Sequence, residues 1–193
     1  MSPIHLRTLV GLLCLAAIYS CQKKDSGSTA PEANLDSLQV LVQSLTVQYD
    51  SAWNDMMADD DNKHFLLLRL VDEVIYTNSA DTALAAKLKA RVAELKTLRY
   101  QRGNMDSPLI DRYDSATSQV IGQVVDFAKA HPRFQDYPLM QELIDEIYTS
   151  QNELLHFRIR HDRYAKQLNA LLDSLPELFP SGAEPISLFE LPA

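Results

Sequence analysis

The sequence predicts an all-α protein, an antiparallel up-down-up-down four-helix bundle with long first and last helices. Between residues 35 and 175 the chain contains only three prolines and two glycines, most of them where turns are expected. The segments between them repeat apolar residues every three to four positions, which is the spacing of an amphipathic helix. Short connections between such helices make neighbours antiparallel.

The first predicted helix covers residues 36–77 and carries one apolar stripe. The stripe consists of Leu38, Leu41, Leu45, Tyr49, Ala52 and Met56 and resumes at Leu67, Leu70 and Val74. A helix of nearly 40 residues is about 60 Å long. The first and last helices should therefore extend beyond the two central ones as a coiled two-helix stalk.

Three consecutive acidic residues, Asp59, Asp60 and Asp61, interrupt this stripe. Asp59, Asp60 and Lys63 fall on the face that bears leucines before and after them, so these charges should be paired or hydrated. Three explanations stay open: an open bundle at the level of the turn at residues 103–107, a break in the helix, or a cation site. Since the acids lack the turn glycine of a calcium loop, we assign no metal ligand.

The three remaining helices have recognisable ends. Asp81 is placed to cap the second helix, and Gly103 is placed to end it. Ser107 and Pro108 suit the N-cap and first turn of the third helix, which runs to about residue 130, before Pro132. The fourth covers about residues 139–175 without glycine or proline. The apolar stripe of the second helix comprises Leu84, Leu88, Val92, Leu95 and Leu98. That of the third comprises Ile110, Tyr113, Val120, Val124 and Phe127. That of the fourth comprises Leu143, Ile147, Leu154, Ala165, Leu168 and Leu172.

The domain that these helices form covers residues 35–176, and a tail of residues 177–193 follows it. The tail alternates prolines with large apolar residues, so an extended conformation is expected. We expect it to lie against the stalk, where it covers apolar surface that two helices cannot hide.

Residues 1–20 have the parts of a secretory signal: His5 and Arg7, an apolar run at 9–18, and a small residue before the cleavage point. About ten apolar residues are too few to cross a bilayer, which takes roughly 20. Residues 18–21 (IYSC) resemble the lipobox of bacterial lipoproteins, so Cys21 is the expected lipidation site and first mature residue. The alternative is a secreted protein with a chance cysteine. Residues 21–34 are polar and are expected to form a flexible tether.

The mature N-terminus and the charge bear on location and partners. Two or more acyl chains give stable membrane anchoring. The CQKKD start resembles tags that direct some lipoproteins to the outer membrane, so this membrane is expected, with the periplasmic or surface face left open. The net charge of −8 becomes −9 once Arg7 leaves with the signal. This argues against nucleic acid and anionic lipid headgroups as partners. Since Cys14 leaves too, no disulfide can form within the domain.

The last helix resembles a known family. Residues 151–176, QNELLHFRIRHDRYAKQLNALLDSLP, are similar to the C-terminal pattern of LemA-family proteins. The matching positions are Asn152, Arg158, Asn169, Ser174 and Pro176, with Ala130-His131-Pro132 upstream and Phe189-Glu190 near the end. His161, Leu168 and Leu175 stand where the family usually has aromatic residues. The resemblance implies a membrane-tethered antiparallel helical bundle without an established enzymatic activity.

The sharpest enzymatic possibility is the pair Glu153 and His156, since di-iron bundles use the spacing Glu-x-x-His. Asp61 and His64 form a weaker version. Such a site needs two of these motifs and further carboxylates, and the third helix contains no Glu. At about 100° per residue, Glu153 and His156 lie about 100° and 160° from the stripe at Leu154, so both should face solvent. No catalytic, cofactor-binding or metal residue is assigned.

Two further residues are expected to be structural. His161 should be a hydrogen-bonded interior residue, and Trp53 should pack in the core or at its edge, with partner contact as the alternative. The sequence therefore predicts a lipid-anchored envelope protein that acts as a scaffold or interaction module with an envelope protein partner and without catalysis. A peptide- or ligand-binding module in the groove between the first and last helices is the alternative, and an enzyme is the third hypothesis. The sequence predicts no oligomeric state.

Overall fold

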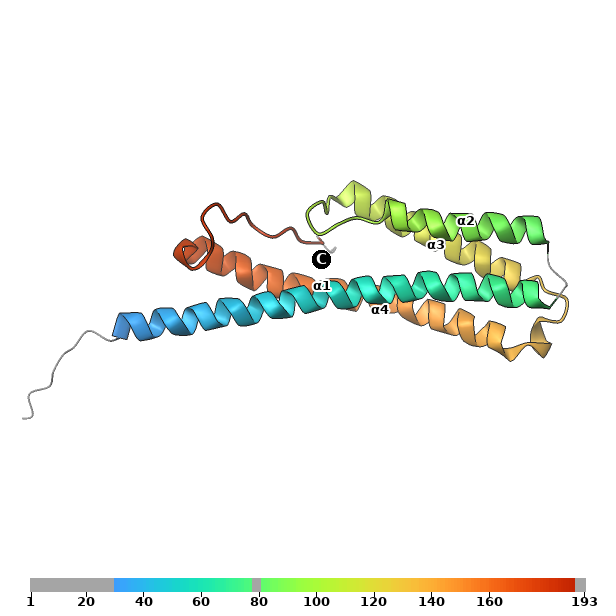
Figure 1. Ribbon diagram of the computed structural model, residues 1–193, viewed down its shortest axis with the longest axis horizontal. Helices are drawn as coiled ribbons and strands as arrows, with labels where there is room; N and C mark the ends of the chain where they lie inside the picture. The colour runs from blue at the N-terminus through green and yellow to red at the C-terminus, as the bar shows by residue number, and fades with distance from the viewer. Residues whose placement is uncertain (1–29, 78–80, 190–193) are drawn as a thin grey trace, which may run out of the picture.

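A computed structural model describes residues 30–77 and 81–189. The predicted signal peptide, Cys21 and the tether up to residue 29 lie outside the described residues. Within the described part, the chain forms four α-helices and two 3₁₀ turns. These are α1 (Ala30–Tyr76), α2 (Thr82–Leu98), α3 (Ser107–Lys129), η1 (Phe134–Asp136), α4 (Pro138–Ser174) and η2 (Pro176–Leu178). The prediction of an all-α four-helix bundle is confirmed, and the colours in Figure 1 show the chain reversing direction from each α-helix to the next.

The molecule consists of a four-helix head and a thinner stalk. Helices α1 and α4 contain 47 and 37 residues, whereas α2 and α3 contain 17 and 23. The short helices therefore lie beside only one half of the α1–α4 pair (Figure 1). The inward faces of all four helices form the core of the head, with fully buried members such as Leu67, Leu70, Leu95, Val124, Leu143 and Ile147.

The stalk has a core of its own, in which the C-terminal segment replaces the missing helices. Buried residues of α1 and α4 form its centre: Leu45, Tyr49, Ala165 and Leu168. Apolar side chains of the segment after α4 pack against them: Phe179, Ile186 and Leu188. The described part of the tail, residues 177–189, lies beside the stalk helices in Figure 1. Among the described helices, none combines the length and hydropathy that a membrane span requires.

Helix ends differ from the prediction at three places. Helix α1 begins at Ala30, so residues 30–34 of the predicted tether are helical. Helix α2 ends at Leu98, because the backbone of Arg99 is extended (φ −62°, ψ 129°), and Gly103 is therefore not its cap. The N-cap of α3 is Asp106 rather than Ser107, since the Asp106 carboxylate accepts the Leu109 N–H at 2.8 Å.

The predicted cap at Asp81 is present. Its carboxylate accepts the backbone N–H groups of Ala83 and Leu84 at 2.9 and 3.0 Å, which satisfies two donors at the start of α2. Helix α1 is continuous through residues 59–63, so a helix break at the acidic triplet is wrong.

Candidate functional site: the junction of head and stalk

Buried polar and aromatic side chains concentrate where the head meets the stalk. We call this group the junction. It draws on the middle of α1 (residues 49–64), the α2–α3 loop (99–106), the start of α3 (113–117), the middle of α4 (150–162) and the end of the tail (186–189). Charged side chains are seldom buried unless they are paired. Six acidic or basic side chains are buried here: Asp60, Lys63, His64, Arg158, His161 and Asp162.

The Asp60 carboxylate is the centre of the junction on the head side. It is 3% exposed and accepts the Tyr113 hydroxyl at 2.5 Å and Nη1 of Arg99 at 3.0 Å. Nζ of Lys63 lies 3.7 Å from it and Nε2 of His64 lies 3.9 Å from it. Helix α3 thus covers this part of α1, and the prediction of an open bundle at this level is wrong. The physical reason is that the second turn of α3 places the Tyr113 ring over the acidic side chain.

Lys63 is the least well satisfied group of the junction. Its side chain is fully buried, and Nζ has no hydrogen-bond partner among the described residues. Its one ion pair is the 3.7 Å contact with Asp60. A buried ammonium with a single distant counter-ion is costly, because little replaces the lost water. Lys63 is therefore a source of instability within the core of the head.

His64 and Tyr113 are held in their neutral forms. Burial lowers the pKa of His64, although the nearby Asp60 carboxylate opposes this shift. Burial also raises the pKa of Tyr113, and the charge of Asp60 raises it further. The Tyr113 hydroxyl donates a hydrogen bond to Oδ2 of Asp60, and Nε2 of His64 lies 3.2 Å from the same hydroxyl. Near neutral pH these groups act as hydrogen-bonding partners rather than as exchangeable charges.

Arg158 of α4 organises the stalk side of the junction. Its guanidinium donates two hydrogen bonds of 2.8 Å to the Asp114 carboxylate and a third, of 3.2 Å, to the Tyr100 hydroxyl. Paired bonds of this kind are strong and directional. The same guanidinium lies 5.0 Å from the centre of the Phe189 ring. Arg158 thus joins α4, α3, the α2–α3 loop and the tail.

His161 and Asp162 hold the end of the tail. Oδ1 of Asp162 lies 3.0 Å from Nδ1 of His161, and both carboxylate oxygens accept the Phe189 N–H, at 3.1 and 3.2 Å. The His161 ring is fully buried, 5.0 Å from the Phe189 ring and 4.8 Å from the Tyr49 ring. These contacts agree with the expectation that His161 is a hydrogen-bonded interior residue.

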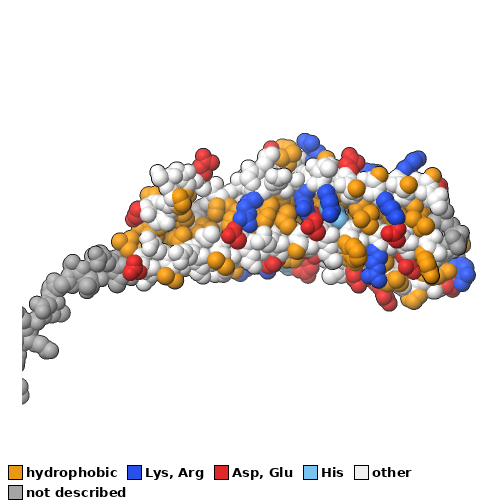
Figure 2. Space-filling view, in the orientation of Figure 1, with side chains coloured by type: hydrophobic (Ala, Val, Ile, Leu, Met, Phe, Trp, Pro, Cys, Tyr) orange, Lys and Arg blue, Asp and Glu red, His pale blue; other side chains and the backbone are white. Residues whose placement is uncertain are grey.

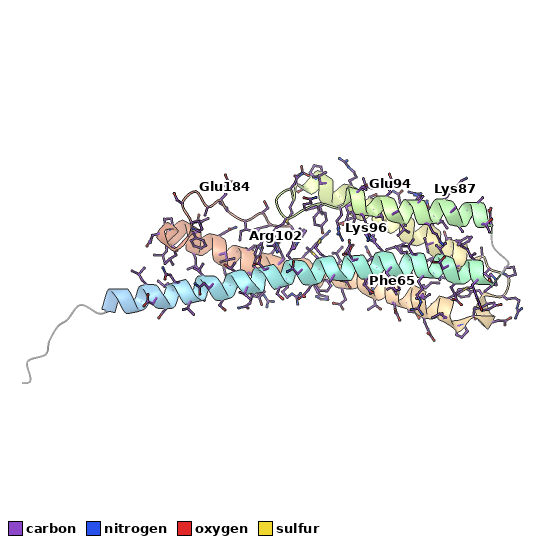
Figure 3. The ribbon with its side chains drawn as sticks, viewed as in Figure 1. Phe65, Lys87, Glu94, Lys96, Arg102 and Glu184 are labelled. Carbon is purple, nitrogen blue, oxygen red and sulfur yellow. The ribbon has the colours of Figure 1, made fainter. Side chains whose placement is uncertain are left out.

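Aromatic rings make the two sides of the junction continuous. Tyr100 contacts Tyr113 edge to face at 5.6 Å on one side and Phe189 at 5.7 Å on the other. Trp53 is 8% exposed and contacts Tyr100 at 6.3 Å, so it packs at the edge of the core. Arg102, a residue of the α2–α3 loop that is labelled in Figure 3, places its guanidinium 5.4 Å from the Trp53 ring of α1.

The acidic triplet does not converge on one point. Asp59 accepts the Ser150 hydroxyl at 2.8 Å, Asp60 faces Tyr113, and the exposed Asp61 accepts Nη1 of Arg99 at 2.9 Å. Asp60 and Asp61 share Nη1 of Arg99, whereas Asp59 bonds Ser150, so the arrangement of the triplet does not support a cation site. In the described part of the chain, no group of three or more His, Cys, Asp or Glu side chains is placed to hold a metal ion.

The Glu-x-x-His pair and the remaining histidine lie away from the junction network. Glu153 and His156 are both exposed on α4, as the helical angles predict. His131 is buried beyond the end of α3, and its Nε2 lies 2.8 Å from the Thr77 hydroxyl.

The partners that complete the junction could not be predicted from the sequence. Tyr113 lies in the apolar stripe of the third helix and Arg99 just after the second, and neither position predicts the contact that both make with Asp60. The available signal was Asp60 and Lys63 on the leucine face, since buried charges require partners. The identity of those partners, 39 and 53 residues away along the chain, carries no periodic signal.

Two depressions lie on the surface, one beside the junction and one at the far end of the stalk. One depression of about 350 Å³ lies between the end of α2 and the start of α3, beside Arg99, Tyr100 and Arg112, and another of about 400 Å³ lies between the end of α4 and the tail. Asp60, Lys63 and His64 line neither of them.

Comparisons of the chain with protein-family models, with curated proteins and with solved structures find no match. Function is therefore inferred from the residues and their contacts.

Proposed function

We propose that this chain is a lipid-anchored bacterial cell-envelope protein of LemA-like type, and that its helical bundle serves as a scaffold or protein-interaction module without catalysis. The anchor is Cys21, within the lipobox-like residues 18–21. The CQKKD start favours the outer membrane, on either face. The C-terminal pattern of residues 151–176 supports the likeness to the LemA family.

The nature of the junction supports a mechanical role. Two of its ion pairs join different elements: Asp60 with Arg99, and Arg158 with Asp114. Such buried pairs require fixed geometry, so they hold head, loop and stalk in one arrangement. A rigid, elongated body attached to a membrane by a short polar segment suits a spacer or a platform for another protein.

The observation that supports an interaction role best is the tail in the stalk. The groove between α1 and α4 holds an extended segment through both main-chain hydrogen bonds and apolar contacts. In Figure 2, hydrophobic side chains are visible between the tail and the stalk helices. The same observation favours the second candidate function, a peptide-binding module that uses this groove.

Chemical crosslinking in cells, followed by capture of the full-length protein, tests the proposal. Cys21→Ala removes the acceptor of the lipid, and Cys14→Ala is the matched control because Cys14 lies within the signal. We expect an acylated N-terminal peptide by mass spectrometry, and an envelope protein captured with the wild type and Cys14→Ala but not with Cys21→Ala. An unmodified N-terminus, or equal capture with Cys21→Ala, would contradict the proposal.

A further inference from the structure

We infer that the groove between α1 and α4 is a binding site for an extended segment of a partner protein, and that the chain's own tail occupies this site in cis. The expected segment has the chemistry of residues 186–189, a branched aliphatic residue followed three positions later by phenylalanine. This inference deepens the proposed interaction role and rests on it, because it names the surface and the class of partner.

The groove forms hydrogen bonds with the main chain of its occupant at two points. The Asn169 side chain donates from Nδ2 to the Ile186 carbonyl at 2.9 Å and accepts the Ile186 N–H at Oδ1 at 2.8 Å. Asp162 accepts the N–H of Phe189. None of these bonds involves a side chain of the tail. The contacts can therefore form with any extended segment that presents the same main-chain groups, as in other modes of peptide recognition.

The spacing of the two points matches an extended peptide. Asp162 and Asn169 are seven residues apart on α4, and a helix rises about 1.5 Å per residue, so they are about 10.5 Å apart along the axis. Ile186 and Phe189 are three residues apart, and an extended chain covers about 3.3 Å per residue, or about 10 Å. The tail runs antiparallel to α4, since Ile186 lies at Asn169 and Phe189 at Asp162. The helix thus sets the register of an extended occupant.

Side-chain contacts make the site selective for an aromatic residue at one end. The Phe189 side chain is 6% exposed and lies among the Tyr100 ring, the His161 ring and the Arg158 guanidinium. A phenyl ring here gains both burial and favourable ring geometry. Ile186 and Leu188 add partly buried contacts on the stalk core, whereas Ser187 points to solvent. The groove therefore contacts an aliphatic side chain at positions 186 and 188 and an aromatic one at 189, and it leaves position 187 exposed to solvent.

The connection to the tail is suited to exchange of the occupant. Residues 180–185 are all exposed, and neither a helix nor a strand forms in them. The turn contains Gly182 in the left-handed region (φ +82°), and Glu184 is labelled on this stretch in Figure 3. A short segment that is joined to the bundle by an exposed loop opens at a lower free energy than the packed helices. A competing segment can therefore replace the tail without unfolding the bundle.

The test uses the full chain with a site-specific protease sequence inserted between Gly182 and Ala183. After cleavage, a fluorescent peptide copying residues 183–193 is added, and its anisotropy reports binding. We expect the cleaved protein to exchange its fragment for the labelled peptide and to bind it at least tenfold more tightly than the uncut protein. A peptide with Phe189→Ala should bind at least tenfold more weakly than the unchanged copy. The matched control peptide, Ser187→Ala, should bind unchanged because Ser187 is exposed.

Several results would overturn the inference. Circular dichroism must show that the cleaved protein keeps its helices; if it does and no labelled peptide binds, the groove is not a peptide site. Equal binding of the Phe189→Ala peptide would remove the aromatic selectivity. Uncut protein that dimerises through exchanged tails, seen as a doubled mass in light scattering, would make a second copy the occupant in place of another protein.

Failure here is distinguishable from failure of the proposed function. If an envelope partner is captured only when Cys21 is present, and the cleaved protein binds no peptide, the interaction role is supported and the groove is rejected as the binding site. Peptide binding by the cleaved protein without acylation at Cys21 would leave the groove standing and remove the lipid-anchored role.

Discussion

Replacing Lys63 with methionine should stabilise this protein, although it removes a charge from a buried network. Lys63 is fully buried, and its ammonium has no hydrogen-bond partner among the described residues. Asp60, its one counter-ion, keeps Arg99 at 3.0 Å and the Tyr113 hydroxyl at 2.5 Å without it. Methionine is unbranched, similar in length and flexible, so it can fill the space that the lysine stem leaves. The substitution therefore removes a desolvated charge without leaving Asp60 unpaired.

The magnitude follows from the geometry of the Lys63–Asp60 pair. At the observed 3.7 Å and an effective dielectric constant of about 20, the attraction is about 4.5 kcal/mol. The effective cost of burying an ammonium is also several kcal/mol, and here no hydrogen bond reduces it. The two contributions nearly cancel, while methionine adds favourable apolar burial. We expect Lys63→Met to raise the free energy of unfolding by about 1–3 kcal/mol, because Asp60 keeps Arg99 as its counter-ion and does not become the uncompensated charge that makes removal of one partner costly.

Urea unfolding measures this difference. Circular dichroism at 222 nm follows the helices, and fluorescence of Trp53, the single tryptophan, follows the junction. With a slope of about 2 kcal/mol per molar urea, a gain of about 2 kcal/mol moves the midpoint upward by roughly 1 M. Lys87→Met is the matched control, because Lys87 is exposed on α2 (Figure 3) and its loss changes the net charge equally. The control should change stability by less than about 0.5 kcal/mol. A midpoint that falls by about 1 M in Lys63→Met would refute the reasoning and show that the ammonium is well solvated or bonded in the core.

Three further changes test the same network. Asp60→Ala should lower the free energy of unfolding by about 3–5 kcal/mol, because it leaves buried cations without their carboxylate; a loss below about 1 kcal/mol in urea unfolding would contradict this. Burial lowers the pKa of His64, so the unfolded chain takes up a proton near pH 6.5 before the folded chain does, and stability should fall as the pH drops below about 6.5. His64→Gln should flatten that part of the pH profile of the urea midpoint, and an unchanged profile would rule out His64 as its source. Arg158→Met should lower the free energy of unfolding by about 2–4 kcal/mol, since Asp114 loses both 2.8 Å bonds. Arg158→Lys should not restore the lost stability, because an ammonium cannot make the paired contact. A lysine variant with the full thermal stability of the wild type would contradict this expectation.

The helical architecture could be predicted from the sequence because its determinants are local. A stripe such as Leu67, Leu70 and Val74 on α1 recurs with the period of a helix, and a capping residue such as Asp81 acts on N–H groups two and three residues ahead. Such signals predicted the class, the number of α-helices and the long first and last helices. They failed at the ends that tertiary contacts decide: α2 stops at Leu98 because Arg99 turns to Asp60 and Asp61, and Tyr100 turns into the core.

The sequence predicted the charged positions of the candidate site but not the residues that contact them. Periodicity placed Asp60 and Lys63 on a face that must be buried, but it could not say what lies opposite that face. The answer came from Tyr113 on α3 and Arg99 after α2, which approach α1 only when the helices pack together. Phe189 likewise reads as one apolar residue in a proline-rich tail until the tail folds back onto α4. The sequence by itself determined which segments are helical and which faces are apolar, since those depend on neighbours three or four residues away. Only the tertiary structure decided which buried charges are paired and which surface the described part of the tail contacts, because those contacts join residues that are distant along the chain.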